Sequence, residues 1–267
     1  MEEKKNITLI STKNPKSLLP NTLTIIGVCL GLSSIKFAID LNFSIAIVAL
    51  LFAAIIDSLD GRIARLIKGT SKVGKELDSL TDVISFGVAP GFIMYFWSVK
   101  NLGKIGWIII LIYVVCCALR LARFNLTNIE QTENWKVNFF QGVPSPAAAG
   151  LVLLPLILSY TDFYLLKYES IVSALIILAT SGLMVSNIPT YSLKKIIITR
   201  NYTIFLLLGI SIYFGLLIVY TFQALFITGL LYLLFIPVSY FHYKSLNKKF
   251  ESFNKNIQKE EEAEDIL

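Results

Sequence analysis

The residues of this sequence best suited to chemistry lie in a short polar segment between two apolar stretches. Four aspartates stand there in two pairs, together with small residues and an arginine. The set consists of Asp57, Asp60, Gly61, Ala64, Arg65, Gly74, Asp78 and Asp82. Carboxylates beside long apolar sequence are costly to place near hydrocarbon, so they indicate a function. Their spacing predicts a pair of divalent cations bound to a diphosphate.

Helical periodicity places each aspartate pair on one face of a helix. With about 100° per residue, Asp60 lies about 60° from Asp57 around the helix axis. On the following helix, Asp82 lies about 40° from Asp78. Two neighbouring helices can therefore direct two carboxylates each into a common gap. Salt bridges with the surrounding lysines and arginines are the alternative, but ion pairing requires neither the small residues nor one shared face.

The small residues and the arginine fit a phosphate ligand. Gly61 and Gly74 remove side-chain bulk where a ligand or a second backbone must come close. Arg65 follows Gly61 by four residues, so it shares a helix face with the first aspartate pair, as does Ala64. Its guanidinium is a planar donor suited to phosphate oxygens.

The composition predicts a membrane protein. Of the 267 residues, 55% are hydrophobic and 16% charged, and the mean hydropathy is +0.69. These values are too apolar for a soluble domain. We predict an all-α, polytopic membrane helix bundle with about eight transmembrane helices, each near the length of about 20 residues that crosses the bilayer core. The predicted helices span residues 20–39, 43–66, 77–98, 104–125, 145–161, 169–189, 202–220 and 223–243.

Charge placement predicts the orientation of these helices. Lysines and arginines gather before the first helix, in the 62–76 and 120–144 connections and after the last helix, whereas the opposite side has few. By the positive-inside rule, we expect both termini on the cytoplasmic side of the cell membrane. The net charge of +6 then reflects topology and contact with anionic membrane lipids, and it is poor evidence for nucleic-acid binding.

The chain is expected to contain one membrane domain and two polar ends. These parts are a cytoplasmic or interfacial N-terminal segment, the membrane domain and a charged cytoplasmic tail, at 1–19, 20–243 and 244–267. The N-terminal segment is polar and charged, so no cleavable signal is expected in it.

The depth of the aspartates favours chemistry on a lipid head group. The second helix is apolar from Phe43 up to Asp57, and the third is apolar after Asp82. Both pairs are therefore expected in the cytoplasmic third of antiparallel helices, where a catalytic cavity would meet water-soluble reagents. A cation transporter using the same carboxylates is the alternative from another class, but it leaves the two glycines, Ala64 and Arg65 unexplained.

The aspartate segment resembles a known family signature. It reads Asp-x-x-Asp-Gly-x-x-Ala-Arg, eight residues, then Gly-x-x-x-Asp-x-x-x-Asp, and it is similar at every fixed position to the CDP-alcohol phosphotransferases. Three further segments, at 85–91, 118–125 and 140–149, look like those of the integral-membrane phosphatidylserine synthases. The resemblance also implies a homodimer.

The resemblance implies roles for individual residues. Asp57 and Asp78 would bind both of two divalent ions, Mg²⁺ or Mn²⁺, while Asp60 would join one ion and Asp82 the other. Asp82, nearest the alcohol, is the candidate general base. The positions that match those holding the CDP part of the lipid are Asn21, Thr24, Gly61, Arg65 and Ser71. Among them, Asn21 and Thr24 would face the phosphates of the nucleotide.

The implied reaction is the transfer of a phosphatidyl group to L-serine. The serine hydroxyl would attack the lipid-side phosphorus of CDP-diacylglycerol or CDP-archaeol and expel CMP. Arg120, Arg123 and Asn125 lie near the cytoplasmic end of the fourth helix and are candidates for binding the serine carboxylate, although the arginines could equally mark topology or pair with lipid phosphate. Glycerol phosphate and inositol phosphate remain alternative acceptors.

Overall fold

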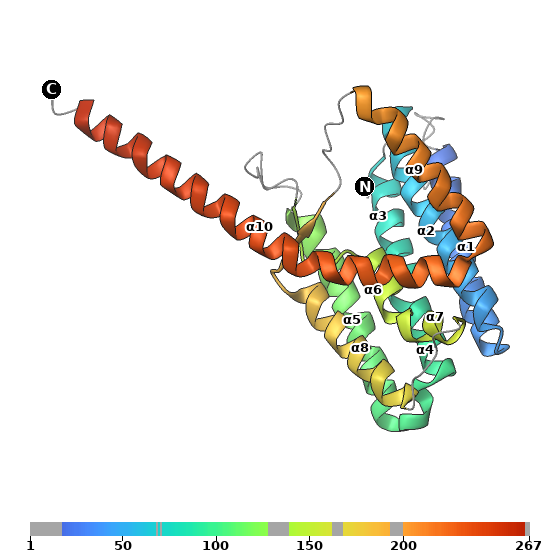
Figure 1. The fold of residues 1–267 in the computed structure, drawn as a ribbon. Coiled ribbons are helices and arrows are strands. Elements are labelled where there is room, and N and C mark those ends of the chain that lie inside the picture. Colours follow the sequence, from blue (N-terminus) through green and yellow to red (C-terminus); the bar gives the residue numbers. More distant parts are fainter. Residues whose placement is uncertain are drawn as a thin grey trace, which may run out of the picture.

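The fold is a helical bundle with one small sheet in the part of the chain that is described. The computed structural model describes residues 18–67, 69, 71–127, 139–161, 168–192 and 200–264 (Figure 1). The first half comprises α1 (Leu18–Ile39), α2 (Phe43–Leu66), α3 (Lys72–Asp82), the π-helix η2 (Val83–Val88), α4 (Ala89–Trp97), the 3₁₀-helix η3 (Val99–Leu102) and α5 (Lys104–Thr127). The second half comprises β1 (Phe139–Gln141), α6 (Ser145–Val152), α7 (Leu154–Ser159), α8 (Glu169–Val185), β2 (Pro189–Tyr191), α9 (Arg200–Val219) and α10 (Thr221–Glu264).

The prediction of an all-α, multi-pass membrane protein is confirmed. Within the described residues, six helices are long and apolar enough to cross a membrane: Leu18–Ile39, Phe43–Leu66, Val73–Trp97, Lys104–Leu126, Tyr202–Val219 and Thr221–Lys248. The expected count of eight is not confirmed. The sixth predicted span is the shorter apolar helix Glu169–Val185, and the fifth is divided.

Pro155 explains why the fifth predicted span is not one helix. α6 ends at Val152, and α7 begins at Leu154 with the proline in its first turn. Proline has no N–H to donate to the carbonyl of Leu151, and its ring clashes with that carbonyl inside a regular helix. The two short helices are nevertheless in the core, with Leu151, Val152 and Leu156 almost fully buried.

The third predicted helix is longer and less regular than expected. It begins at Lys72 because the Ser71 side chain caps its N-terminus, accepting a hydrogen bond from the Gly74 N–H at 2.9 Å. Directly after Asp82 the chain forms η2 and then α4. A π-helical segment widens the turn and rotates the following residues relative to the preceding ones, and such segments often occur at functional sites.

The π-helix is supported by its neighbours. The buried Tyr113 hydroxyl on α5 donates a hydrogen bond to the Phe86 carbonyl at 2.8 Å. On the opposite side α1 comes very close, since a Cβ on Gly31 would lie 2.6 Å from the Ser85 Oγ. These contacts hold α1 and α5 against η2, directly after Asp82, the last aspartate of the motif.

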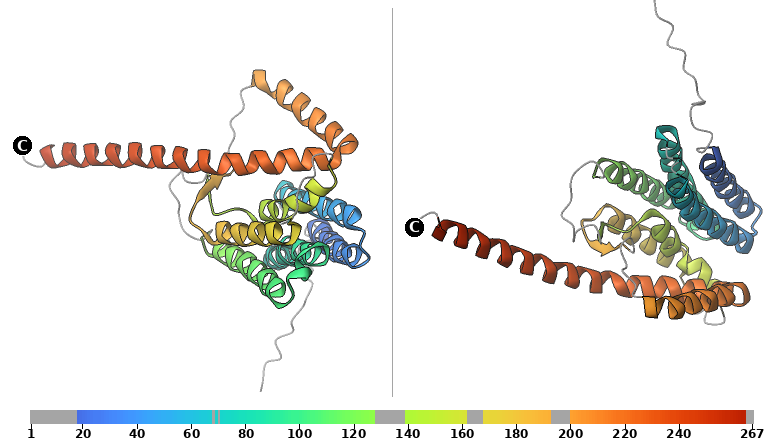
Figure 2. Two further views of the ribbon diagram at one scale, coloured as in Figure 1. Left: turned by 60° about the horizontal axis from the view of Figure 1, so that its bottom comes forward. Right: turned by 90° about the horizontal axis from the view of Figure 1, so that it is seen from above.

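Two features of the second half were not predicted from the sequence. β1 and β2 pair antiparallel, with Phe139 opposite Tyr191 and Gln141 opposite Pro189. α10 continues without interruption through the predicted boundary between the membrane domain and the tail at 243/244, and it extends far beyond the other helices (Figure 2). The N-terminal segment predicted at 1–19 lies outside the described residues except for its last two.

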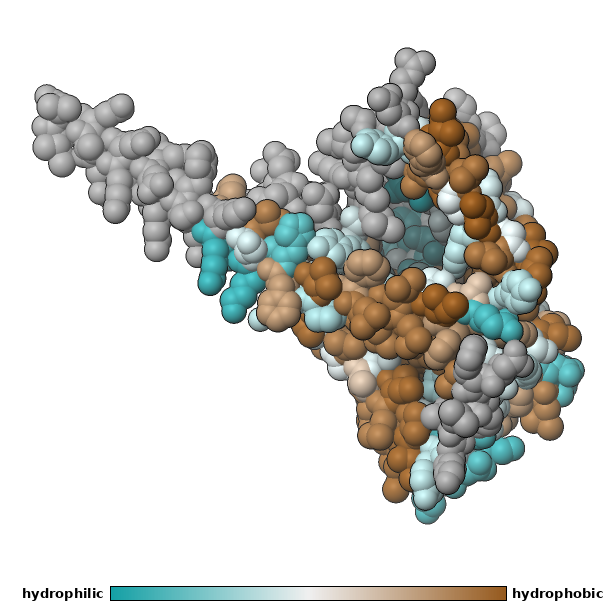
Figure 3. Space-filling model, in the orientation of Figure 1, coloured by the Kyte–Doolittle hydropathy of each residue, from teal (hydrophilic) through white to brown (hydrophobic). Residues whose placement is uncertain are grey.

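Apolar side chains cover the outer surfaces of α9 and of the first half of α10, as expected for helices that face lipid (Figure 3). Beside α9 and above α10, the same view shows a hollow with a hydrophilic floor (Figure 3). The molecule therefore combines a lipid-compatible exterior with a polar interior that is open to the outside.

Candidate active site

Three of the four aspartates gather at the point where α2 and α3 face each other. Asp57, Asp60 and Asp78 each offer a carboxylate oxygen, and these oxygens all lie within 4.8 Å of one another. Mg²⁺ binds oxygen at about 2.0–2.1 Å, so two ligands on opposite sides of one ion lie about 4 Å apart. The cluster therefore has the spacing and the all-oxygen chemistry of a hard divalent cation site.

The fourth aspartate lies beside this cluster. The carboxyl groups of Asp82 and Asp57 adjoin one another. Each has a buried oxygen, Oδ1, that receives no hydrogen bond. Buried carboxylate oxygens without partners are costly, and cations would satisfy them. All four aspartates thus fit the metal ligands implied by the resemblance, with Asp82 placed next to the trio.

Salt bridges with the described lysine and arginine side chains do not account for the aspartates. In the described part of the chain, no lysine or arginine forms an ion pair with any of the four carboxylates. The salt bridge that the structure shows joins Lys36 and Asp40 at the far end of α1, where both side chains are exposed. A purely structural ion-pair network is therefore not supported among the described side chains, which do not include those of Lys68 and Lys72.

Asp60 is held by a side chain from α1. It is almost fully buried, at 3% exposure, and the Thr24 hydroxyl donates a hydrogen bond to its Oδ2 at 2.7 Å. Thr24 is buried as well, and its Oγ1 also lies 3.0 Å from the Pro20 carbonyl oxygen. The sequence resemblance placed Thr24 at the nucleotide phosphates. In the structure its hydroxyl orients a carboxylate of the cluster.

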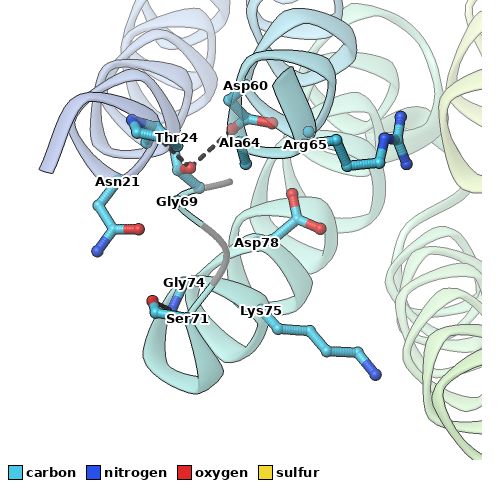
Figure 4. Close-up of a pocket in the computed structure, with 12 residues that line it drawn as sticks. Asn21, Thr24, Asp60, Ala64, Arg65, Gly69, Ser71, Gly74, Lys75 and Asp78 are labelled. Atoms are coloured by element: carbon cyan, nitrogen blue, oxygen red, sulfur yellow. Dashed lines mark hydrogen bonds between the residues drawn. The ribbon is translucent and has the colours of Figure 1, made fainter. Parts of the chain in front are cut away.

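A cavity of about 470 Å³ opens beside the cluster between α1, α2 and α3 (Figure 4). All five residues predicted to hold the CDP moiety line it, namely Asn21, Thr24, Gly61, Arg65 and Ser71. Asp60 and Asp78 also line it, so the cavity reaches two of the expected metal ligands. The structure therefore brings the predicted nucleotide-binding residues together next to the carboxylates.

Lys75 also lines the cavity and was not predicted as a site residue. Its side chain and that of Arg65 extend toward the same side of the cavity (Figure 4). Helical spacing could have indicated this position, because Lys75 precedes Asp78 by three residues on α3. Two cations thus stand near the carboxylates, as a diphosphate ligand requires.

The two glycines of the motif, Gly61 and Gly74, have different structural roles. A Cβ on Gly61 would meet no heavy atom within 4 Å, so this glycine leaves free space in the cavity wall. A Cβ on Gly74 would lie 2.7 Å from Asn21 Oδ1 and 3.0 Å from Ser71 Oγ. Gly74 therefore allows the start of α3 to approach α1, whereas Gly61 allows a ligand to approach α2.

The three predicted acceptor residues lie in different surroundings. Arg120 is buried, at 8% exposure, and its Nη1 donates a hydrogen bond to Ser145 Oγ at 2.6 Å. Its guanidinium carbon lies 5.6 Å from the centre of the Phe124 ring, and its charge interacts with Asp82. Its Nε is buried without a hydrogen-bond partner. Arg120 is thus a buried cation on the Asp82 side of the cluster.

Arg123 and Asn125 have contacts of their own with neighbouring elements. Arg123 Nη1 donates to the Val185 carbonyl at 3.2 Å, and its Nη2 donates to Asn187 Oδ1. Asn125 Nδ2 donates to Ser79 Oγ at 3.0 Å and so connects α5 to α3. Of the three, Arg120 interacts electrostatically with an aspartate of the motif, Asp82. Its partner Ser145 was not predicted, because 25 residues separate the two in sequence.

Comparison with known proteins agrees with the motif. Residues 17–185 match the sequence model of the CDP-alcohol phosphatidyltransferases. The chain is 39% identical to a CDP-diacylglycerol–serine O-phosphatidyltransferase of Helicobacter pylori, over 83% of this chain and 90% of that protein. It is 35% identical to the enzyme of the same name from Mycobacterium tuberculosis, over 73% and 68% of the two chains. An archaetidylserine synthase of Methanothermobacter thermautotrophicus is 36% identical over 64% and 68%.

Proposed function

Because the chain belongs to the CDP-alcohol phosphatidyltransferase family, we propose that it transfers the phosphatidyl group of a CDP-activated diglyceride to L-serine. The names of the bacterial relatives include both CDP-diacylglycerol and serine, and the archaeal relative is named for archaetidylserine. The observation that carries the proposal is the carboxylate cluster beside a cavity lined by all five predicted CDP-binding residues. The lipid would be CDP-diacylglycerol or CDP-archaeol, and the products phospholipid and CMP.

Asp57, Asp60, Asp78 and Asp82 would hold two divalent ions, Mg²⁺ or Mn²⁺. Such ions neutralise a diphosphate and orient it for displacement. The fit rests on the all-oxygen donor set, on the 4.8 Å spacing within the trio and on the two buried oxygens without partners. Thr24 would keep the Asp60 carboxylate in a ligating orientation through its 2.7 Å hydrogen bond.

Arg65 and Lys75 would bind the diphosphate from the open side of the cavity. The Arg65 guanidinium can donate two parallel hydrogen bonds to phosphate oxygens, while the Lys75 ammonium acts as a point charge. Asn21 and Ser71 line the opposite part of the cavity and would contact the nucleotide (Figure 4). The free space at Gly61 would let the ligand approach the α2 backbone.

The chemical step would be a direct displacement. The serine hydroxyl oxygen attacks the lipid-side phosphorus and forms the new P–O bond. The bond from that phosphorus to the bridging diphosphate oxygen breaks, and CMP leaves with its electron pair. Asp82 would accept the hydroxyl proton as general base. Histidine is the other common base, but His242, the single histidine, lies on α10 with its Nδ1 2.8 Å from the Tyr191 hydroxyl.

Arg120 would bind the carboxylate of serine. It is a buried cation next to the proposed base, and its Nε lacks a partner, so a bound anion would complete its hydrogen bonding. Arg123 and Asn125 would support the acceptor side less directly. Arg123 donates a hydrogen bond at the end of α8, and Asn125 donates one to α3.

The proposal includes the setting of the enzyme. Both termini would lie in the cytoplasm, by the distribution of lysine and arginine, and the cavity would open to that side of the cell membrane. A homodimer, suggested by the family resemblance, completes the proposal.

A panel of acceptors tests the function. Purified protein in detergent with CDP-diacylglycerol and Mg²⁺ is given serine, glycerol phosphate or inositol phosphate, and CMP release is measured. We expect release with serine well above that with the other two. Asp57→Asn serves as the inactive control. Faster release with glycerol phosphate or inositol phosphate would refute serine as the acceptor, and cation flux into liposomes without CMP release would refute the enzyme.

A further inference from the structure

Pro90 follows the π-helix η2 by two residues and accounts for its position in the chain. In a regular α-helix the N–H of residue 90 would donate a hydrogen bond to the Phe86 carbonyl. Proline has no N–H, and its ring would clash with that carbonyl. The chain instead forms the wider turn, in which the Ala89 N–H donates to the Ile84 carbonyl five residues back. Pro90 thus disfavours a regular helix directly after the aspartate segment.

Tyr113 on α5 supplies a hydrogen bond that Pro90 cannot. Its hydroxyl donates to the Phe86 carbonyl at 2.8 Å, and the two residues are almost fully buried, at 0% and 1% exposure. Water cannot easily reach a carbonyl in such a place, so the loss of a donor is costly there. The proline removes one donor and the tyrosine provides another, and both therefore act on the same carbonyl oxygen.

The π-turn lies between a firmly packed helix and the helix that carries two of the aspartates. On the packed side, α4 buries Ile93 and Met94, and a Cβ on Gly91 would lie 3.2 Å from Ile110 on α5. On the other side, most described residues of α3 are exposed or half-buried. A π-turn contains one residue more than an α-turn, so without it α3 would be rotated by about 100° relative to α4. Such a rotation would turn the aspartates of α3 away from those of α2.

We propose that Pro90 and Tyr113 are positioning residues that set the rotation of α3 and so direct Asp78 and Asp82 toward the aspartates of α2. This inference rests on the proposed function, in which these carboxylates hold divalent ions and Asp82 is the base. Pro90 and Tyr113 would act through the backbone of η2, at the Phe86 carbonyl. A tyrosine that only stabilised the fold would change stability and leave the metal affinity of the folded protein unaltered.

The test separates metal affinity from stability. The wild type, Tyr113→Phe and the double variant Pro90→Ala/Tyr113→Phe are purified in detergent. Electron paramagnetic resonance gives the dissociation constant of Mn²⁺ without lipid or serine, and thermal unfolding is recorded without metal. Asp78→Asn shows the effect of a lost ligand. Tyr213→Phe is the matched control, because it removes a tyrosine hydroxyl whose partner, at 3.0 Å, is Thr228 on α10.

We expect Tyr113→Phe to lower the unfolding temperature and to weaken Mn²⁺ binding about 10–100-fold, the range typical when a group that orients metal ligands is lost. The double variant should regain stability, because the restored N–H can satisfy the Phe86 carbonyl and alanine favours a helix far more than proline does. Its affinity for Mn²⁺ should stay at least as weak as that of Tyr113→Phe, since a regular helix gives α3 the wrong rotation. Tyr213→Phe should bind Mn²⁺ as the wild type does.

An unchanged Mn²⁺ affinity in Tyr113→Phe would overturn the proposal. A double variant that regains both stability and affinity would overturn it as well, because Tyr113 would then only satisfy a carbonyl. A double variant no more stable than Tyr113→Phe would show that the two residues do not act on the same carbonyl. If Tyr113→Phe does not fold, the affinity of the stable double variant decides.

These results are distinct from a failure of the proposed function. Wild-type protein that binds Mn²⁺ but releases no CMP with serine would refute the acceptor and leave the comparison of metal affinities intact. Wild-type protein that binds no Mn²⁺ would refute the proposed metal site and this inference together.

Discussion

Replacing Thr24 by valine distinguishes two roles for this side chain. By resemblance, Thr24 faces the phosphates of the nucleotide. In the structure its hydroxyl donates to Asp60 Oδ2 at 2.7 Å, and both residues are more than nine-tenths buried. Valine has nearly the same shape and keeps the β-branch, so the substitution removes mainly the hydroxyl. The Asp60 carboxylate then loses its partner in a place where water cannot easily replace it.

The size of the effect follows from the hydrogen bond. A hydrogen bond to a charged group contributes about 1.5–3 kcal/mol, which corresponds to a factor of about 10–150 in a binding constant. Removal of a hydrogen-bond partner of a metal-ligating residue typically costs about 10–100-fold in metal affinity or activity. We therefore expect Thr24→Val to raise the Mg²⁺ concentration for half-maximal activity by about 10–100-fold.

The assay is CMP release as a function of Mg²⁺, with CDP-diacylglycerol and serine at saturating concentrations. Thr24→Ser keeps the hydroxyl and should remain within a few-fold of the wild type. A Thr24→Val variant with an unchanged Mg²⁺ dependence and a raised KM for CDP-diacylglycerol would refute the reasoning. Thr24 would then contact the nucleotide and not position Asp60. Equal damage in Thr24→Ser and Thr24→Val would also refute it, because the hydroxyl would not be the cause.

Three further substitutions test the site. Asp57→Asn should abolish CMP release with little loss of folded protein, since it removes an anionic ligand and also relieves the crowding of carboxylates; near-wild-type turnover at saturating Mg²⁺ would contradict the two-metal site. Arg65→Lys should raise the KM for CDP-diacylglycerol more than that for serine, because a point charge cannot replace the planar guanidinium; an effect on the KM for serine alone would move Arg65 to the acceptor site. Asp82→Asn should keep measurable CDP-lipid binding while CMP release falls by at least about 10²–10⁴-fold, the contribution typical of a general base. If binding and CMP release instead fell together and excess metal restored both, Asp82 would be a metal ligand and not the base.

Much of the candidate site could be predicted from the sequence because its determinants are local. The aspartates of each pair are one turn apart, so helix geometry alone places them on one face. The apolar runs on either side determine that these helices cross the membrane, and the type of residue determines the chemistry of the donors. The resemblance to the family, and not helix geometry, assigned Asn21, Gly61, Arg65 and Ser71 to the CDP moiety, and the structure brings all four to one cavity.

Other features could not be read from local pattern. A regular helix was predicted across 77–98, whereas the chain forms a π-helix after Asp82 that Tyr113 and α1 support from outside. Eight spans were counted from apolar runs, although the chain divides one run at Pro155 and shortens another. At the π-helix contacts from other segments, and at Pro155 the missing N–H of the proline, outweigh the hydropathy of the run.

The sequence by itself determined the membrane class, the helical faces of the aspartates and the donor chemistry of the motif, because each depends on residue type and spacing within one helix. Only the tertiary structure decided that Thr24 binds Asp60 across 36 residues and that Arg120 pairs with Ser145 across 25. It also separated Gly61, which borders open space, from Gly74, which packs against Asn21. Such pairings depend on which helix faces pack together, and that choice is set by the sum of many small contacts across the whole bundle.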